Sequence, residues 1–303
     1  MGLVADGTAY LLQRSAPRTV RYGESLRFAG TDLPPPRLFR IPTRRGFVGV
    51  HVYRPVDERR DHPVYVHLHG GAFVMRFPEM DDFFCRYVVA TCDAVVLNVD
   101  YDVAPQARYP VAQEQAHDVF AWACSHPAEL RADPTRVALG GFSAGGGLAA
   151  AAALQARDLG TRQPVMQLLA VPALDVASPV DRHSASMITP RVQRLVRRTY
   201  FKDPARRAEP YASPVLAEDL HGLAPAVVVT AQHDVLRDAG DRYARRLREA
   251  GNRVGHHVVP GVDHYFLDGG RAQALEVLAL IAGSLQDAMG TSPTGPSPLR
   301  AAR

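Results

Sequence analysis

The 303-residue sequence lacks any uninterrupted apolar run of about 18 residues, which is the length that a membrane-spanning helix needs. Its first residues, Met1 to Asp6, also lack the basic segment and the apolar block of a secretory signal peptide. We therefore expect a cytoplasmic protein that makes no stable insertion into a membrane.

Cysteine is scarce, and its three occurrences are Cys85, Cys92 and Cys124. An odd number of cysteines without Cys-x-x-Cys spacing or a nearby histidine pair indicates neither a disulfide framework nor a zinc site. We expect these residues to be small buried apolar side chains, and we expect no metal.

Lysine is almost absent. Lys202 is the only one, and arginine carries the remaining basic charge. The net charge is a modest +4. The densest basic cluster consists of Arg191, Arg194, Arg197, Arg198, Lys202, Arg206 and Arg207. Apart from the pair Tyr200-Phe201, the cluster lacks the interleaved aromatic residues of a single-strand binding groove, and it has no zinc or recognition-helix signature. We therefore interpret it as a solvated helix face and expect no nucleic-acid partner.

The rest of the sequence alternates short apolar runs, typical of buried strands, with longer segments of helical spacing. Strands are expected at 48–53, 63–68, 94–99, 136–140, 165–171, 225–231 and 253–259. Helices are expected at 8–13, 80–91, 110–125, 147–157, 239–250 and 272–286. This alternation predicts an α/β fold with a mostly parallel central sheet and helices on both faces.

The segments outside this alternation define the expected organisation of the chain. Residues 1–45 contain a proline-rich break and are expected to form an irregular or helical N-terminal arm, and the Pro- and Arg-rich residues 177–214 an insertion. The core then consists of residues 46–176 and 215–287. Residues 288–303 are rich in Gly, Ser, Thr and Pro, and we expect them to be a disordered tail.

The segment Gly141-Phe142-Ser143-Ala144-Gly145 lies between an apolar run and an alanine-rich segment of helical character. A strand, Gly-x-Ser-x-Gly and a helix in this order are typical of a nucleophile elbow, a sharp turn that exposes the serine. Gly141 and Gly145 supply the small neighbours that such a turn requires. The pentapeptide alone is a weak signal, because a glycine-rich helix start shows the same pattern.

Polar residues that follow other predicted strands supply the partners that a nucleophilic serine needs. The carboxyl ends of parallel strands share one edge of the sheet, and Asp234 and His264 each follow a strand that ends there. A serine hydroxyl needs a base, and the base needs a group that fixes its tautomer. We predict that Ser143 is the nucleophile, His264 the base and Asp234 the orienting acid, in the chain order of α/β-hydrolases.

Neighbouring histidines and aspartates are less suited to these roles. His256 and His257 lie within the last predicted strand and not at its end. Asp238 lies at a helix start, where capping is its expected role. Asp263 directly precedes His264 and is expected to point away from it.

The segment His69-Gly70-Gly71-Ala72 follows a predicted strand and offers successive backbone N–H groups with little side-chain bulk. Together with the N–H of Ala144 it is predicted to form an oxyanion hole for a tetrahedral intermediate. Gly70 and Gly71 would equally suit a plain turn at the end of a strand. His69 is expected to brace the loop by hydrogen bonding and not to transfer protons.

These segments and several others together resemble the hormone-sensitive-lipase-like group of α/β-hydrolases, which includes many bacterial carboxylesterases. The matching segments are His69 to Phe73, Asp100 to Pro105, Pro110 to Ala112, Gly141 to Gly146, Ala212 to Pro214, Asp234 to Asp238 and Asp263-His264. The resemblance covers roughly residues 45–285. It implies the α/β-hydrolase fold, ester hydrolysis without a cofactor, and a helical cap built from the N-terminal arm and the insertion.

Some residues around the expected site depart from the family's usual pattern. Ala72 stands where the family has a third glycine, Phe142 where it has aspartate or threonine, and Tyr265 where it has glycine. Phe142 and Tyr265, together with Phe73, are our candidates for the substrate pocket. These departures leave the range of substrates open.

The sequence thus favours a serine carboxylesterase that hydrolyses small to medium acyl esters through an acyl-enzyme. The same residues would also suit a deacetylase, lactonase or amidase that acts on a specialised metabolite. A non-catalytic ligand receptor on this fold is a third alternative, although such a protein is expected to lack part of the triad. The expected partner is a small-molecule ester, and a homo-oligomer stays open.

Overall fold

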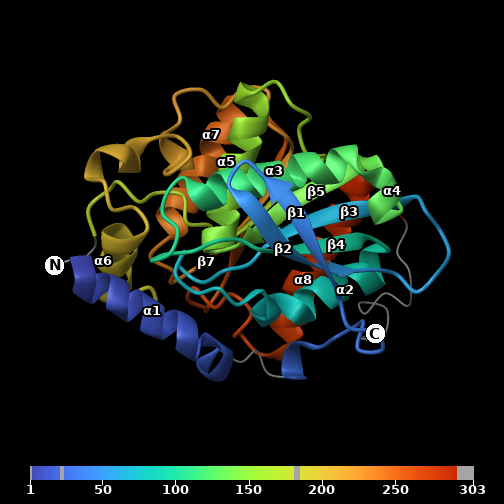
Figure 1. The fold of residues 1–303 in the computed structure, drawn as a ribbon, viewed down its shortest axis with the longest axis horizontal. Coiled ribbons are helices and arrows are strands. Elements are labelled where there is room, and N and C mark those ends of the chain that lie inside the picture. The colour runs from blue at the N-terminus through green and yellow to red at the C-terminus, as the bar shows by residue number, and fades with distance from the viewer. Residues whose placement is uncertain (1, 21–23, 181–184, 292–303) are drawn as a thin grey trace.

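A computed structural model describes residues 2–20, 24–180 and 185–291, and its centre is an eight-stranded sheet (Figure 1). The strand order is β1-β2-β4-β3-β5-β6-β7-β8. The strands are β1 (Arg37–Thr43), β2 (Gly46–Tyr53), β3 (His62–Leu68), β4 (Val95–Asp100), β5 (Ala132–Phe142), β6 (Gln167–Ala170), β7 (Ala226–Ala231) and β8 (Val254–Val259). Strand β2 pairs antiparallel with β1 and β4, and all other neighbours are parallel. The predicted mostly parallel sheet is therefore confirmed.

Helices cover both faces of this sheet (Figure 1). They are α1 (Gly2–Thr19), α2 (Asp82–Cys92), α3 (Val111–Ser125), α4 (Pro127–Leu130), α5 (Ala144–Asp158), α6 (Pro190–Thr199), α7 (Arg237–Glu249) and α8 (Arg271–Met289). The described residues also contain four short 3-10 helices, at Glu24–Leu26, Pro78–Asp81, Pro204–Ala208 and Pro214–Leu216. In the described part of the chain, none of these helices combines the length and apolar character needed to cross a membrane.

Strand β3 shows why the sequences of the central strands are continuous apolar runs. Val64, Val66 and Leu68 pack into the core shared with α3, α5 and α7. Tyr65 points the other way, into the core shared with α2 and α8. Because successive side chains of a strand face opposite sides, a sheet covered on both faces needs apolar residues at nearly every position.

The N-terminal 45 residues differ from the expected irregular or helical arm. Residues 37–43 form β1, which pairs with β2 at the edge of the sheet and so belongs to the core. Helix α1 is also longer than the predicted 8–13. The edge strand lacked a clear signal because Ile41 is its only buried residue.

The insertion at 177–214 contains helix α6, and its residues Arg191, Arg194 and Arg198 are exposed, as expected for a solvated helix face. The tail was expected to begin at residue 288, but α8 continues to Met289, which is buried. The rest of the expected tail, residues 292–303, lies outside the described residues.

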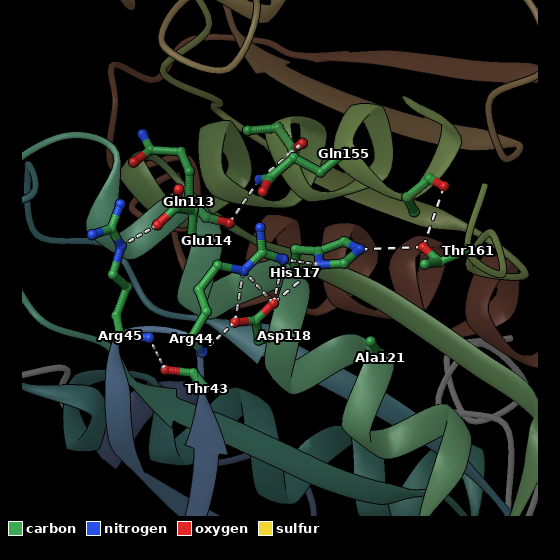
Figure 2. Close-up of polar contacts among 12 residues, drawn as sticks. Thr43, Arg44, Arg45, Gln113, Glu114, His117, Asp118, Ala121, Gln155 and Thr161 are labelled. Carbon is green, nitrogen blue, oxygen red and sulfur yellow. Dashed lines mark hydrogen bonds and ion pairs between the residues drawn. The ribbon is translucent and has the colours of Figure 1, made fainter. Parts of the chain in front are cut away.

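Polar contacts at the β1–β2 turn attach this hairpin to α3 (Figure 2). Nε of Arg44 lies 3.0 Å from Asp118, and its terminal nitrogen lies 2.9 Å from Nδ1 of His117. Arg45 contacts Glu114 one turn earlier on α3. His117 in turn lies 3.2 Å from the hydroxyl of Thr161, beyond the end of α5. The antiparallel edge of the sheet is thereby joined to two helices of one face.

Candidate active site

The turn between β5 and α5 holds Ser143 in a conformation that side-chain-bearing residues rarely adopt. Its φ is 55° and its ψ is −116°. A Cβ atom at Gly141 or Gly145 would collide with the carbonyl oxygen of Leu68 at the end of β3. The two glycines therefore allow the helix and the neighbouring strand to approach closely enough to form the turn.

The structure brings the three predicted triad residues together. The Oγ of Ser143 lies 2.8 Å from Nε2 of His264, and Nδ1 of His264 lies 2.7 Å from Oδ2 of Asp234. Ser143 follows β5, Asp234 follows β7 and His264 follows β8, so the shared edge of the sheet collects residues that are 121 and 30 positions apart. The side chain of Asp234 is fully buried, which keeps water away from its bond to the imidazole.

The other oxygen of Asp234 is also occupied. Its Oδ1 accepts a hydrogen bond of 2.9 Å from the backbone N–H of Leu236, just before α7. This contact fixes the carboxylate plane toward His264. Asp238 lies inside the first turn of α7, and no side chain caps that helix, so the expected capping role of Asp238 is wrong.

The remaining competitors face other groups. Nε2 of His256 lies 2.9 Å from Asp241. Asp263 accepts hydrogen bonds of 2.6 Å from the hydroxyl of Ser186 and from the N–H of Met187. Asp263 also accepts a hydrogen bond of 2.6 Å from the backbone N–H of His264, and it holds the segment that leads into α6.

The loop after β3 presents unpaired backbone N–H groups beside Ser143. Gly71 has φ 114° and Ala72 has φ 55°. The carbonyl of Gly71 accepts hydrogen bonds from the N–H groups of Val74 and Met75, over 3.0 and 2.9 Å. A Cβ at Gly71 would lie 2.9 Å from Met75, so glycine is required there. Within the described residues, the N–H groups of Gly71, Ala72 and Ala144 donate to no other protein group.

His69 lies beneath this loop and is fully buried. Its Nδ1 lies 2.6 Å from the carbonyl oxygen of Gly70, and its ring stacks on Tyr101 at 4.3 Å. The hydroxyl of Tyr101 donates to the carbonyl of His69 over 2.7 Å. Burial lowers the pKa of His69 to about 4, so the ring is neutral at physiological pH. This geometry agrees with the bracing role predicted from the sequence.

Two cavities adjoin Ser143. The larger cavity, of about 250 Å³, is lined by His264, Phe142, Tyr265 and a set of further apolar side chains. The smaller cavity, of about 60 Å³, is lined by Phe73, Ala144, Val196 and their neighbours. Ala72, Ser143, Ile188 and Val192 line both. Each of the three aromatic pocket candidates therefore borders one of the cavities.

Several cavity residues carry no signal in the sequence. Val171, after β6, lines the larger cavity with φ 42°, which is unusual for a β-branched residue. Val192 of α6 and Val20, just after α1, reach the same cavity from distant parts of the chain. Single apolar residues in such positions belong to no motif, and only the folded chain brings them together.

One group of described side chains has the donor types of a metal site. Ligand atoms of Asp57, His62 and Asp93 lie within 4.8 Å of one another, at the end of β3 that is remote from Ser143. The guanidinium of Arg59 contacts both carboxylates and lies 2.9 Å from Nδ1 of His62. The positive charge that these carboxylates require is thus supplied by the arginine.

With this geometry in view, the chain can be compared with known proteins. A family model described as the alpha/beta hydrolase fold matches residues 65–268. The chain belongs to the α/β-hydrolase family. Within it, the chain falls in the hormone-sensitive-lipase-like group that the sequence motifs indicated.

Similar α/β-hydrolases are esterases by name. An arylesterase of Saccharolobus solfataricus is 35% identical over 246 residues, which cover 78% of each chain. The carboxylic ester hydrolase LipN of Mycobacterium tuberculosis is 36% identical over 238 residues, covering 75% of this chain and 63% of that protein. The solved esterase of Pyrobaculum calidifontis has a TM-score of 0.81 at 32% identity, covering 96% of this chain and 94% of its own.

Proposed function

We propose that this α/β-hydrolase is a serine carboxylesterase that uses Ser143 as nucleophile, His264 as general base and Asp234 as the residue that orients His264. The observation that carries the proposal is the continuous chain of short contacts from Ser143 Oγ through His264 to Asp234. It ends beside backbone N–H groups and an apolar cavity, which is where an ester carbonyl would have to lie.

In the first half of the reaction, Oγ of Ser143 attacks the ester carbonyl carbon while its proton passes to Nε2 of His264. The carbonyl electron pair moves onto oxygen, and the N–H groups of Gly71, Ala72 and Ala144 stabilise that charge. Each such donor typically contributes about 3–4 kcal/mol at the transition state. The bond to the alcohol oxygen then breaks, and His264 gives its proton to the departing alcohol.

In the second half, a water molecule attacks the acyl-enzyme with His264 again as the base. The acid leaves and the proton returns to Oγ of Ser143, so the enzyme is restored without a cofactor. Asp234 stays ionised and stabilises the imidazolium in both halves. Its buried bond to Nδ1 keeps the lone pair of Nε2 directed at the serine.

The two cavities determine how the bound substrate is oriented. The departing alcohol takes its proton from His264, so it must lie on the side that His264 lines, which is the larger cavity. The acyl group then extends into the smaller cavity, where Val196 and Ala173 leave about 60 Å³. We therefore assign short acyl groups and bulky apolar alcohols to this enzyme.

The cap also belongs to the proposal. Val20 after α1 and Val192 of α6 border the larger cavity, and the two helices pack together. We assign α1 and the insertion to a cap over the core, with β1 excluded from it. The cap would set the size of the alcohol that can reach Ser143.

Covalent labelling tests the nucleophile directly. The wild-type protein should react with a fluorophosphonate and gain the corresponding mass, while Ser143→Ala should not and should lose about six orders of magnitude in turnover of p-nitrophenyl acetate. Ser125→Ala, an exposed serine on α3, is the matched control and should label fully. A labelled Ser143→Ala protein, or an unlabelled wild type, would refute the assignment.

A further inference from the structure

Helix α1 has its small apolar residues inside and its large ones outside. Its buried residues are all alanines, namely Ala5, Ala9 and Ala16. The exposed fractions of Leu3, Val4 and Leu11 are 89%, 76% and 69%. An amphipathic helix on a soluble domain normally turns its large apolar residues toward the core, so α1 has the reverse arrangement.

Six of the exposed residues of α1 form one continuous stripe along the helix, flanked by the exposed Thr8, Tyr10, Leu12 and Pro17. Their spacing of three and four positions places them on a single side, which we call the outer stripe: Leu3, Val4, Gly7, Leu11, Arg14 and Arg18. Its first half is apolar and its second half is basic. An exposed apolar patch of this kind marks a surface that a partner covers.

The adjoining helix carries further exposed positive charge. Helix α6 packs against α1 (Figure 1), and its exposed arginines Arg191, Arg194 and Arg198 share one face at helical spacing. Helix α6 contains no acidic residue. The one acid of α1, Asp6, lies 2.9 Å from Arg108 and is therefore neutralised.

We propose that the outer stripe of α1 and the three exposed arginines of α6 dock onto an anionic phospholipid bilayer, with α1 lying in the plane of the interface. Leucine and valine side chains would enter the boundary between headgroups and acyl chains, while the guanidinium groups bind lipid phosphates. The excess of positive charge favours lipid over a second copy of this chain, because a two-fold contact would place arginines against arginines.

Residues next to the docking surface line the larger cavity, so docking would place that cavity at the bilayer. Val20 directly follows the outer stripe, and Val192 lies among the arginines of α6, and both line the larger cavity. An apolar ester dissolved in the bilayer would thus meet the cavity beside the docking surface. Binding to lipid itself does not depend on the proposed esterase activity.

Sedimentation with sucrose-loaded vesicles tests the docking surface. The wild-type protein should bind vesicles of phosphatidylcholine and phosphatidylglycerol, and should bind phosphatidylcholine alone weakly. The variant Leu3→Ser, Val4→Ser, Leu11→Ser should lose about tenfold or more in partition coefficient. The variant Arg191→Gln, Arg194→Gln, Arg198→Gln should lose a comparable factor and most of the salt dependence.

A matched control is Leu38→Ser, Val56→Ser, Leu159→Ser, which removes apolar residues that are 73%, 76% and 54% exposed elsewhere. It should bind like the wild type, and all variants should hydrolyse a soluble ester equally, which shows that they are folded. Absence of wild-type binding, or equal loss in the control, would overturn the proposal. So would a dimer that only the α1 variant dissociates, because the surface would then join two copies.

Discussion

At the scale of single residues, left-handed backbone conformations gather around Ser143, the proposed nucleophile. Ala72, Phe73, Ser143 and Val171 have φ between 42° and 57°, and all four line a cavity beside the site. Each such residue costs roughly 1–3 kcal/mol and persists only where its surroundings hold it. Ser143, for example, donates its backbone N–H to the carbonyl of Ala170 over 2.9 Å. The packed sheet thus maintains a turn that the serine would not adopt alone.

His69 makes the stability of the protein depend on pH. In the folded protein it stays neutral down to about pH 4, whereas the unfolded chain takes up the proton near the ordinary value of 6.5. Between these values the unfolded state binds more protons, so the free energy of unfolding decreases as the pH falls. The shift corresponds to about 3 kcal/mol, fully present above pH 6.5 and lost by about pH 4.

Urea unfolding at pH 7 and pH 4.5 would measure this contribution. His69→Gln should remove most of the decrease in unfolding free energy, about 2–3 kcal/mol, whatever its cost at pH 7. His221→Gln changes a histidine whose side chain is 76% exposed and should keep the wild-type dependence. An unchanged slope in His69→Gln would show that another group is responsible.

At the scale of secondary-structure elements, the attachment of the β1–β2 hairpin depends on Asp118. Burial alone would raise the pKa of Asp118, but hydrogen bonds from His117 and Arg44 outweigh burial and lower it to about 2. The carboxylate therefore stabilises the fold above its ordinary value of 3.8, and that stabilisation is lost as the pH falls toward 2. Arg44 is 40% exposed, so solvent screening reduces the gain.

Asp118→Asn should lower the free energy of unfolding by about 1–2 kcal/mol at pH 7, because Arg44 and His117 lose a charged acceptor. The difference from the wild type should shrink as the pH falls toward 2, because Asp118 takes up its proton over this range. Asp268→Asn, which changes an exposed carboxylate, serves as the control in the same urea titrations. An equal loss at both pH values would indicate a packing effect and contradict the electrostatic explanation.

The sequence predicted some elements better than others for physical reasons. The stretch from Val64 to Leu68 is buried on both sides of the sheet, so its apolar run was unambiguous. Strand β1 has one buried residue, Ile41, and α6 is rich in arginine, so neither shows an apolar run that would mark its limits. The sequence of α1 does not indicate which face of the helix is buried, because alanines pack inward while leucines point outward.

At the scale of the whole molecule, the triad and the cavities differ in how far sequence can reveal them. Ser143, Asp234 and His264 each follow a strand, and parallel strands end at one edge, so a motif and a rule of topology were sufficient. The larger cavity combines Val20, just after α1, with side chains from α6 and the loops after β3, β6 and β8. No sequence pattern specifies how helices such as α1 and α6 sit on the core. The volumes of the two cavities could therefore be determined only from the structure.

The direction of the substrate across core and cap leads to a prediction about selectivity. Against a series of p-nitrophenyl esters, kcat/KM should fall at least about tenfold between butyrate and octanoate, because the smaller cavity holds few acyl carbons. Val196→Ala enlarges only that cavity and should move the optimum to longer acyl chains. Met187→Ala opens only the larger cavity and should change the preference among acetates of different alcohols. If the two substitutions exchanged these effects while fluorophosphonate labelling of Ser143 persisted, the enzyme would remain an esterase but would bind its substrate the other way round.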